Sequence, residues 1–137
     1  MAKGSKSCFI VFSAALVGSF SVSTAIAQCN PGGSCKVDVT VGANCAISVQ
    51  PDPLDVPGPR RAKKITWTIV EGNFEFAPNG IEFKSPTNEF EDPDRQGKRF
   101  TWKNKHTQAG DFAYNVNVVS TVPNPTSCKL DPIIRNR

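Results

Sequence analysis

Four carboxylates crowd into one short stretch of this chain, the densest group of side chains that could bind a metal. They are Glu89, Glu91, Asp92 and Asp94. Calcium takes about six to eight oxygen ligands, which calcium-binding loops space regularly around a glycine turn. Pro93 interrupts the stretch and no glycine lies at its midpoint, so the pattern favours a surface loop. A degenerate enzyme that depends on a divalent metal held by residues 89–94 is the alternative.

His106 is the single histidine of the chain. A serine or cysteine nucleophile needs a base that a third group orients, and structural zinc needs a cluster of thiolates and imidazoles. His106 follows Lys103 and Lys105 in a short polar segment, which predicts an ordinary surface residue. No glycine-rich phosphate loop accompanies it. The sequence therefore predicts no catalytic residue, no metal, no cofactor and a protein that is not an enzyme.

Basic residues gather in two stretches and are the candidate binding residues. Such runs are usually solvated loops, but they can also form a patch for an acidic surface such as anionic polysaccharide or lipid headgroups. The candidates are Arg60, Arg61, Lys63, Lys64, Lys98, Arg99, Lys103 and Lys105.

The first 27 residues have the features of a cleaved signal peptide. Lys3 and Lys6 precede an apolar run over residues 8–22, and Ala25-Ile26-Ala27 follows as a small-residue cleavage site. Serines and glycines dilute the run, which argues against a membrane anchor. A lipid anchor on Cys29 is disfavoured because Gln28, rather than a small residue, precedes it. We therefore expect export to the periplasm or the medium.

Cleavage leaves 110 residues, which is enough for one domain spanning residues 28–137. The removed segment carries two of the sixteen basic residues and none of the twelve acidic ones, so the net charge falls from +4 to +2. This charge is too small to indicate nucleic acid as a partner. No later apolar run approaches membrane length, so the sequence predicts no membrane span after cleavage.

Four cysteines remain after cleavage, and an even number in a small exported domain predicts disulfides. Three pairings are possible. Cys35 and Cys45 bracket a predicted hairpin in which they would not lie opposite each other. The favoured pairing is Cys29–Cys35 across an Asn-Pro-Gly-Gly-Ser loop, with Cys45–Cys128 tying an early strand to the last one.

Alternating apolar and polar residues recur along the chain, which is typical of β-strands that bury one face. The segment 65–83 predicts consecutive antiparallel strands around a Pro-Asn-Gly turn, and Trp67 is its largest core candidate. The proline-rich segment 51–64 is expected to run along an edge or as a connection, and the polar segment 84–98 is expected to be a second long connection. About seven or eight strands and no helical pattern outside the signal predict an antiparallel Greek-key β-sandwich. The predicted strands cover residues 37–41, 45–49, 65–69, 74–76, 81–83, 100–102, 112–118 and 128–134.

Several of these segments resemble cupredoxin-like and, more loosely, immunoglobulin-like sandwiches of small exported bacterial proteins. They are Thr66-Trp67-Thr68, Phe74-x-Phe76, Gly80-Ile81-x-Phe83, Leu130-Asp131-Pro132-Ile133-Ile134 and the run from Gly110 to Val116. That last run is similar to the G-x-Y-x-Y-x-C segment that leads to the copper ligands of cupredoxins.

The resemblance does not extend to copper chemistry. Blue-copper sites need two imidazoles and a thiolate, usually with an axial methionine. Here Val116 stands in place of the cysteine, His106 is the sole imidazole, and Met1 is the sole methionine and lies in the predicted signal. We therefore expect no copper electron transfer.

These observations favour a non-catalytic exported protein that acts as a binding or structural module through its loops or a sheet edge. Its partner would be a protein that the sequence does not specify or an anionic envelope component, and its oligomeric state is left open. Besides the metal-dependent alternative, a small secreted inhibitor of a hydrolase fits a disulfide-stapled exported domain.

The exported product is expected to begin at Gln28 and to contain two disulfides. Intact mass before and after reduction measures both properties in one experiment. A mass that still includes residues 1–27, or a gain on reduction other than four hydrogens, would contradict these expectations.

Overall fold

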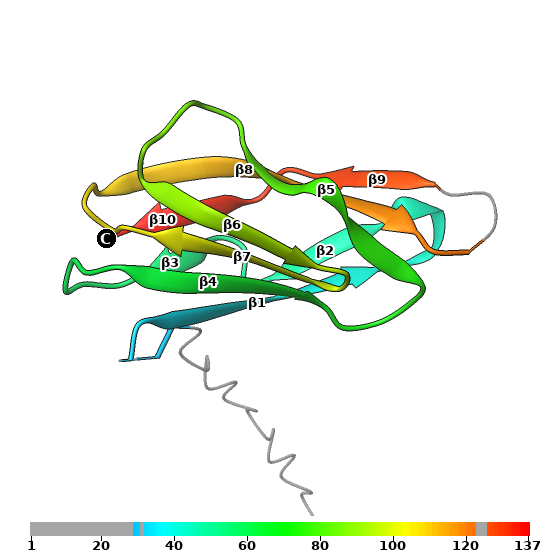
Figure 1. The fold of residues 1–137 in the computed structure, drawn as a ribbon, viewed down its shortest axis with the longest axis horizontal. Helices are drawn as coiled ribbons and strands as arrows, with labels where there is room; N and C mark the ends of the chain where they lie inside the picture. The colour runs from blue at the N-terminus through cyan, green and yellow to red at the C-terminus, as the bar shows by residue number, and fades with distance from the viewer. Residues whose placement is uncertain (1–28, 31, 123–125) are drawn as a thin grey trace, which may run out of the picture.

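The computed structural model describes residues 29–30, 32–122 and 126–137, and the predicted signal peptide lies outside the described residues. Within the described part, ten strands and one short 3-10 helix form two layers (Figure 1). The elements are β1 Ser34–Val41, η1 Ala43–Cys45, β2 Ile47–Gln50, β3 Leu54–Val56, β4 Lys63–Ile69, β5 Phe74–Phe83, β6 Phe90–Gln96, β7 Arg99–Asn104, β8 Gly110–Ser120, β9 Ser127–Leu130 and β10 Ile133–Asn136.

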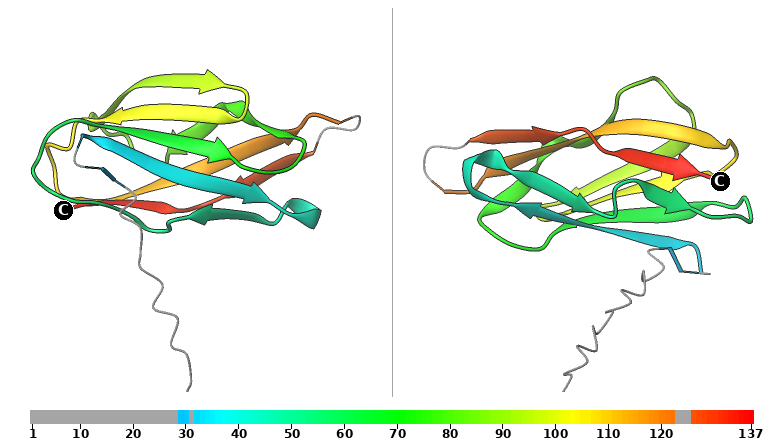
Figure 2. Two further views of the ribbon diagram at one scale, coloured as in Figure 1. Left: turned by 90° about the horizontal axis from the view of Figure 1, so that it is seen from below. Right: turned by 180° about the vertical axis from the view of Figure 1, so that it is seen from behind.

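Each layer is a five-stranded mixed sheet, and the two sheets pack face to face (Figure 2). The first sheet has the order β2-β1-β4-β7-β6. The second has the order β3-β10-β8-β5, and β9 also pairs with β8. The pairs β1–β4 and β3–β10 are parallel, whereas the other pairs are antiparallel. The all-β sandwich is confirmed, but the predicted strand number was too low and the sheets are not purely antiparallel.

The segment 65–83 contributes its two strands to different sheets, which corrects the prediction of consecutive paired strands. β4 pairs with β1 and β7, whereas β5 pairs with β8. The Pro-Asn-Gly sequence is no turn between strands, because β5 continues through it with a register shift between Phe76 and Ile81. A Cβ on Gly80 would lie 2.7 Å from Cβ of Phe76 and 3.0 Å from the ring of Phe100. The irregularity therefore requires glycine at this position.

The core lies between the sheets around Trp67 and Tyr114. The indole Nε1 of Trp67 donates a hydrogen bond to the hydroxyl of Tyr114 at 3.1 Å, and the two rings meet edge to face with centroids 5.5 Å apart. Both side chains are fully buried. Because Trp67 comes from the first sheet and Tyr114 from the second, this contact joins the two layers.

β6 was predicted to be part of a connection, and the structure shows instead that it is the edge strand of the first sheet. Its sequence hides this role because Pro93 cannot donate a ladder hydrogen bond, Asp92 has a φ of 55°, and the register shifts between Glu91 and Asp94. Proline and bulges are tolerated at sheet edges, where they also hinder edge-to-edge pairing. β3 lies at the edge of the other sheet, within the proline-rich segment 51–64, where the peptide bonds before Pro51, Pro53 and Pro59 are cis.

Two disulfides join Cys29 to Cys35 and Cys45 to Cys128, the pairing that the sequence favoured. The second bridge links residues 83 positions apart and attaches η1 to β9. Disulfides form and persist in oxidising compartments, so they indicate a non-cytoplasmic environment. Among the described residues, no helix has the length and apolar character needed to span a membrane.

The burial of Tyr114 predicts a pH dependence at alkaline pH. Burial raises the pKa of the Tyr114 hydroxyl above its ordinary value. Because the folded state then holds this proton more tightly than the unfolded chain, the contribution to stability is complete below pH about 10 and is lost as the pH rises through the raised pKa. Tyr114 is the only tyrosine, so tyrosinate absorbance reports this group alone.

We expect no tyrosinate signal from the folded protein near pH 10 and a signal that appears together with unfolding at higher pH. The same chain in guanidinium provides the unperturbed titration. A folded protein that ionises near pH 10 with unchanged circular dichroism would contradict the prediction.

Candidate functional site

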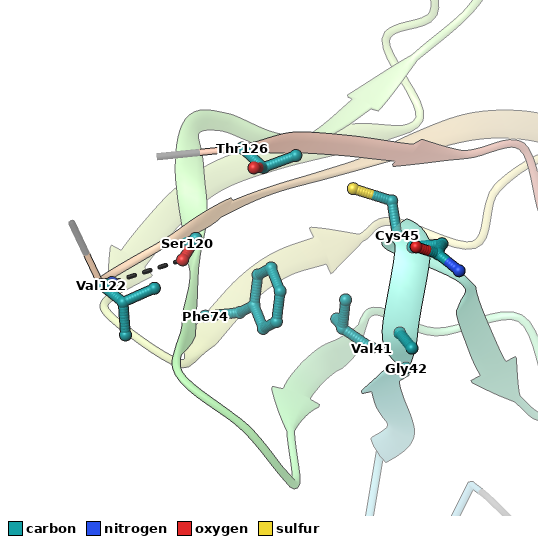
Figure 3. Close-up of a pocket in the computed structure, with 9 residues that line it drawn as sticks. Val41, Gly42, Cys45, Phe74, Ser120, Val122 and Thr126 are labelled. Atoms are coloured by element: carbon teal, nitrogen blue, oxygen red, sulfur yellow. Dashed lines mark hydrogen bonds between the residues drawn. The ribbon is translucent and has the colours of Figure 1, made fainter. Parts of the chain in front are cut away.

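A cavity lies at one end of the sandwich, between the β1–β2 turn and the described ends of β8 and β9 (Figure 3). It has a volume of about 710 Å³, within the usual range for ligand sites. Its lining residues come from β1, η1, the start of β5 and both arms of the hairpin. They are Val41, Gly42, Ala43, Asn44, Cys45, Phe74, Ser120, Val122 and Thr126. We call this space the end cavity.

One wall of the end cavity is a backbone turn held in an unusual conformation. Asn44 and Cys45 have φ values of 57° and 60°, in the left-handed region that costs non-glycine residues roughly 1–3 kcal/mol. Backbone hydrogen bonds and a disulfide hold the turn. Gly42 donates a backbone hydrogen bond to Ala46 at 2.8 Å, and the disulfide to Cys128 attaches the turn to β9. The wall is therefore shaped before any ligand arrives.

The chemistry of the end cavity is apolar and uncharged. Phe74 lies between Val41 and Ser120 in Figure 3, and Val122 is 45% exposed at the mouth. The backbone amide of Val122 donates to the hydroxyl of Ser120 at 3.3 Å. Hydrogen-bonding capacity comes from Asn44, Ser120 and Thr126, and no described lining residue carries a charge. The cavity therefore suits a neutral ligand with an apolar face.

A second concave surface, the aromatic groove, lies along the side of the sandwich between the edge strands β5 and β6. It has a volume of about 390 Å³. Phe83 stacks on Phe90 with centroids 3.8 Å apart and meets Trp102 edge to face at 5.5 Å. The lining residues are Pro78, Asn79, Ile81, Glu82, Phe83, Ser85, Pro86, Thr87, Phe90, Pro93, Phe100 and Trp102.

The basic candidates do not form one patch. Lys64, Arg99 and Lys103 lie on the outer face of the first sheet, where β4 and β7 pair. Arg60 and Arg61 belong to the exposed β3–β4 loop, whereas Lys63 is buried at 3% exposure.

Several of these cations already have partners within the chain. Lys103 pairs with Glu91 at 2.6 Å, and this contact lowers the pKa of the exposed Glu91 carboxyl. Lys98 donates to the backbone carbonyl of Gly72 at 2.7 Å, and Arg99 donates to the side chain of Gln96. Lys105 is half-buried, and its backbone amide donates to the carbonyl of Glu89 at 2.8 Å.

The four carboxylates of residues 89–94 do not converge on a common point. Glu89 is buried and accepts hydrogen bonds from both the amide and the hydroxyl of Thr107. Asp94 accepts from Gln96 at 2.9 Å. Among the described residues, no three histidine, cysteine or acidic side chains are grouped so that they could hold a metal. The segment is a sheet edge rather than the predicted surface loop, and the structure offers the metal-dependent alternative no support.

The prediction that His106 is a surface residue was wrong, because the last strand covers it. Its side chain is fully buried, and its Nε2 lies 3.2 Å from the backbone carbonyl of Arg137. The backbone amide of His106 donates to the side-chain oxygen of Asn104, which also bonds with Asn136. These contacts join β7 to β10, so the imidazole lies in a structural network.

Comparison with known proteins adds no relative to this picture. No protein family matches the chain, and no curated protein matches it. The function proposed for this chain therefore depends on the geometry of the site.

Glu89→Ala is expected to lower the free energy of unfolding by about 1–3 kcal/mol, because the amides of Thr107 and Gln108 would lose a buried acceptor. Asp94→Ala, at an exposed position of β6, the strand that follows Glu89, is the control and should change it by less than about 0.5 kcal/mol. Urea unfolding followed by tryptophan fluorescence measures both values. Equal effects would contradict the structural role of Glu89, and a calcium-dependent stabilisation that Glu89→Ala abolishes would restore the metal alternative.

Proposed function

We propose that this chain is a non-catalytic exported binding module, located in the periplasm or outside the cell, whose ligand occupies the end cavity. The observation that carries the proposal is an uncharged cavity of about 710 Å³ whose wall is fixed by a disulfide. Preformed walls favour binding because little ordering entropy is lost when the ligand arrives. The two disulfides support an extracytoplasmic location.

The lining defines the class of ligand. Phe74, Val41 and Val122 offer an apolar surface, while Asn44, Ser120 and Thr126 offer amide and hydroxyl groups. A neutral sugar ring has matching chemistry, since it presents C–H groups on its faces and hydroxyls around its edge. A charged ligand would lose hydration without gaining an opposite charge among the described lining residues. We therefore propose a neutral glycan as the ligand class.

The resemblance to cupredoxin-like or immunoglobulin-like proteins of bacteria belongs to the same proposal. The two-layered all-β fold supports it at the level of architecture. Val116, at the position of the copper cysteine, belongs to β8 and is fully buried in the core between the sheets. The proposed function therefore involves no copper, and the proposed ligand site lies at one end of the sandwich.

Val122→Lys is expected to weaken binding of a neutral oligosaccharide about tenfold or more, because it puts a charge at the mouth of an uncharged cavity. Val70→Lys is the matched control, since Val70 is equally exposed at 46% but does not line the cavity. Isothermal titration calorimetry against a panel of neutral and anionic oligosaccharides measures the affinities.

Asn44→Gly tests the amide separately, because glycine accepts the left-handed φ and removes only the side chain. We expect weaker binding with an unchanged fold. Binding of anionic sugars only, binding that neither Val122→Lys nor Asn44→Gly changes, or no binding across the panel would overturn the proposal.

A further inference from the structure

The aromatic groove has the form of a docking site for an extended segment. Its floor is made of buried Ile81, Phe90 and Phe100, and its walls are the half-buried rings of Phe83 and Trp102. The indole Nε1 of Trp102 donates to the carbonyl of Ile81 at 3.1 Å, so its ring is fixed in place. Rigid aromatic walls are the surfaces on which proline-rich segments dock.

The aromatic groove carries a negative charge. Among the described lining residues, the single charged side chain is the exposed Glu82, whose contact with Asn79 is 3.5 Å long. Asp92 and Asp94, on either side of Pro93, line a separate hollow together with Lys64 and Lys103, and Asp92 lies 4.0 Å from Lys103. The nearby cation Lys103 is held by Glu91 at 2.6 Å. An occupant should therefore combine apolar rings with positive charge.

The chain itself carries a segment of this chemistry. The β3–β4 loop contains Pro57-Gly58-Pro59-Arg60-Arg61-Ala62, and all six residues are exposed. Figure 1 shows this loop projecting beyond the ends of the strands, and Figure 2 confirms its position from behind. Within one copy, Arg60 donates to the carbonyl of Thr107 at 3.2 Å.

We propose that the β3–β4 loop of a second copy of this chain docks in the aromatic groove. The proline rings pack against Phe83 and Trp102, and an arginine of the loop pairs with Glu82. Arginine suits this place because its guanidinium both stacks on aromatic faces and pairs with carboxylates. Such a contact joins two different surfaces, so it forms rings or chains of copies unless it closes on itself in a pair. This surface is separate from the end cavity.

Sedimentation velocity of the processed, oxidised protein from about 5 to about 500 µM, the range of weak self-association, tests the proposal. We expect an average mass that rises with concentration. Glu82→Lys and the double variant Arg60→Glu/Arg61→Glu should each weaken association about tenfold or more, because like charges then meet in the groove. Lys64→Glu, an exposed cation just beyond the loop, and Val122→Lys, in the end cavity, should not.

The decisive experiment mixes the two charge-reversed variants. Glu82→Lys chains and Arg60→Glu/Arg61→Glu chains should associate with each other although each fails to associate with itself, because the charges are exchanged across the contact. A peptide of residues 56–62 should compete with wild-type association and shift Trp102 fluorescence, and its Arg→Glu version should not. A wild-type protein that stays monomeric at about 500 µM, or variants and mixtures that all associate like the wild type, would overturn the proposal.

Discussion

Trp67 and Tyr114 make the contact on which the rest of the fold depends. The indole proton and the phenol oxygen are both removed from water at the centre of the molecule, so each needs the other as its hydrogen-bond partner. β4 lies in the middle of the first sheet and β8 in the interior of the second, and the contact fixes these two strands opposite each other. Every edge strand is placed relative to this pair. The edges can therefore be irregular, with bulges and prolines, while the centre stays regular.

The two sheets are joined by different means along one long side and at one end of the sandwich. On the β5 side, the amide of Phe76 donates to the carbonyl of Gly97, Arg95 donates to the carbonyl of Phe76, and Trp102 donates to the carbonyl of Ile81. These bonds satisfy backbone groups that an open edge would expose, and they leave aromatic rings between the strands as a groove. At the end of the sandwich that holds the end cavity, the Cys45–Cys128 bridge holds η1 against β9 and shapes that cavity. Each proposed binding surface thus arises where one sheet is joined to the other.

The sequence predicted best the elements whose burial follows a simple period. The alternation in β1, β4 and β8 matches their buried positions, including Val37, Trp67 and Tyr114. The prediction failed for β6. Pro93 and three exposed acidic or amide residues make this segment look like a loop, although its backbone pairs with β7. His106 was misread because its sequence neighbours are polar, whereas its burial comes from a strand 27 or more residues later. The end cavity could not be predicted, since its walls come from residues 41–45, Phe74, Ser120, Val122 and Thr126 and only the fold brings them together.

The second sheet also constrains the order in which the chain can fold during synthesis. β3 forms early in the chain, yet its partner in the sheet is β10, and Cys45 bonds with a cysteine 83 positions further on. The second sheet of a growing chain therefore stays incomplete until the final strands emerge from the ribosome.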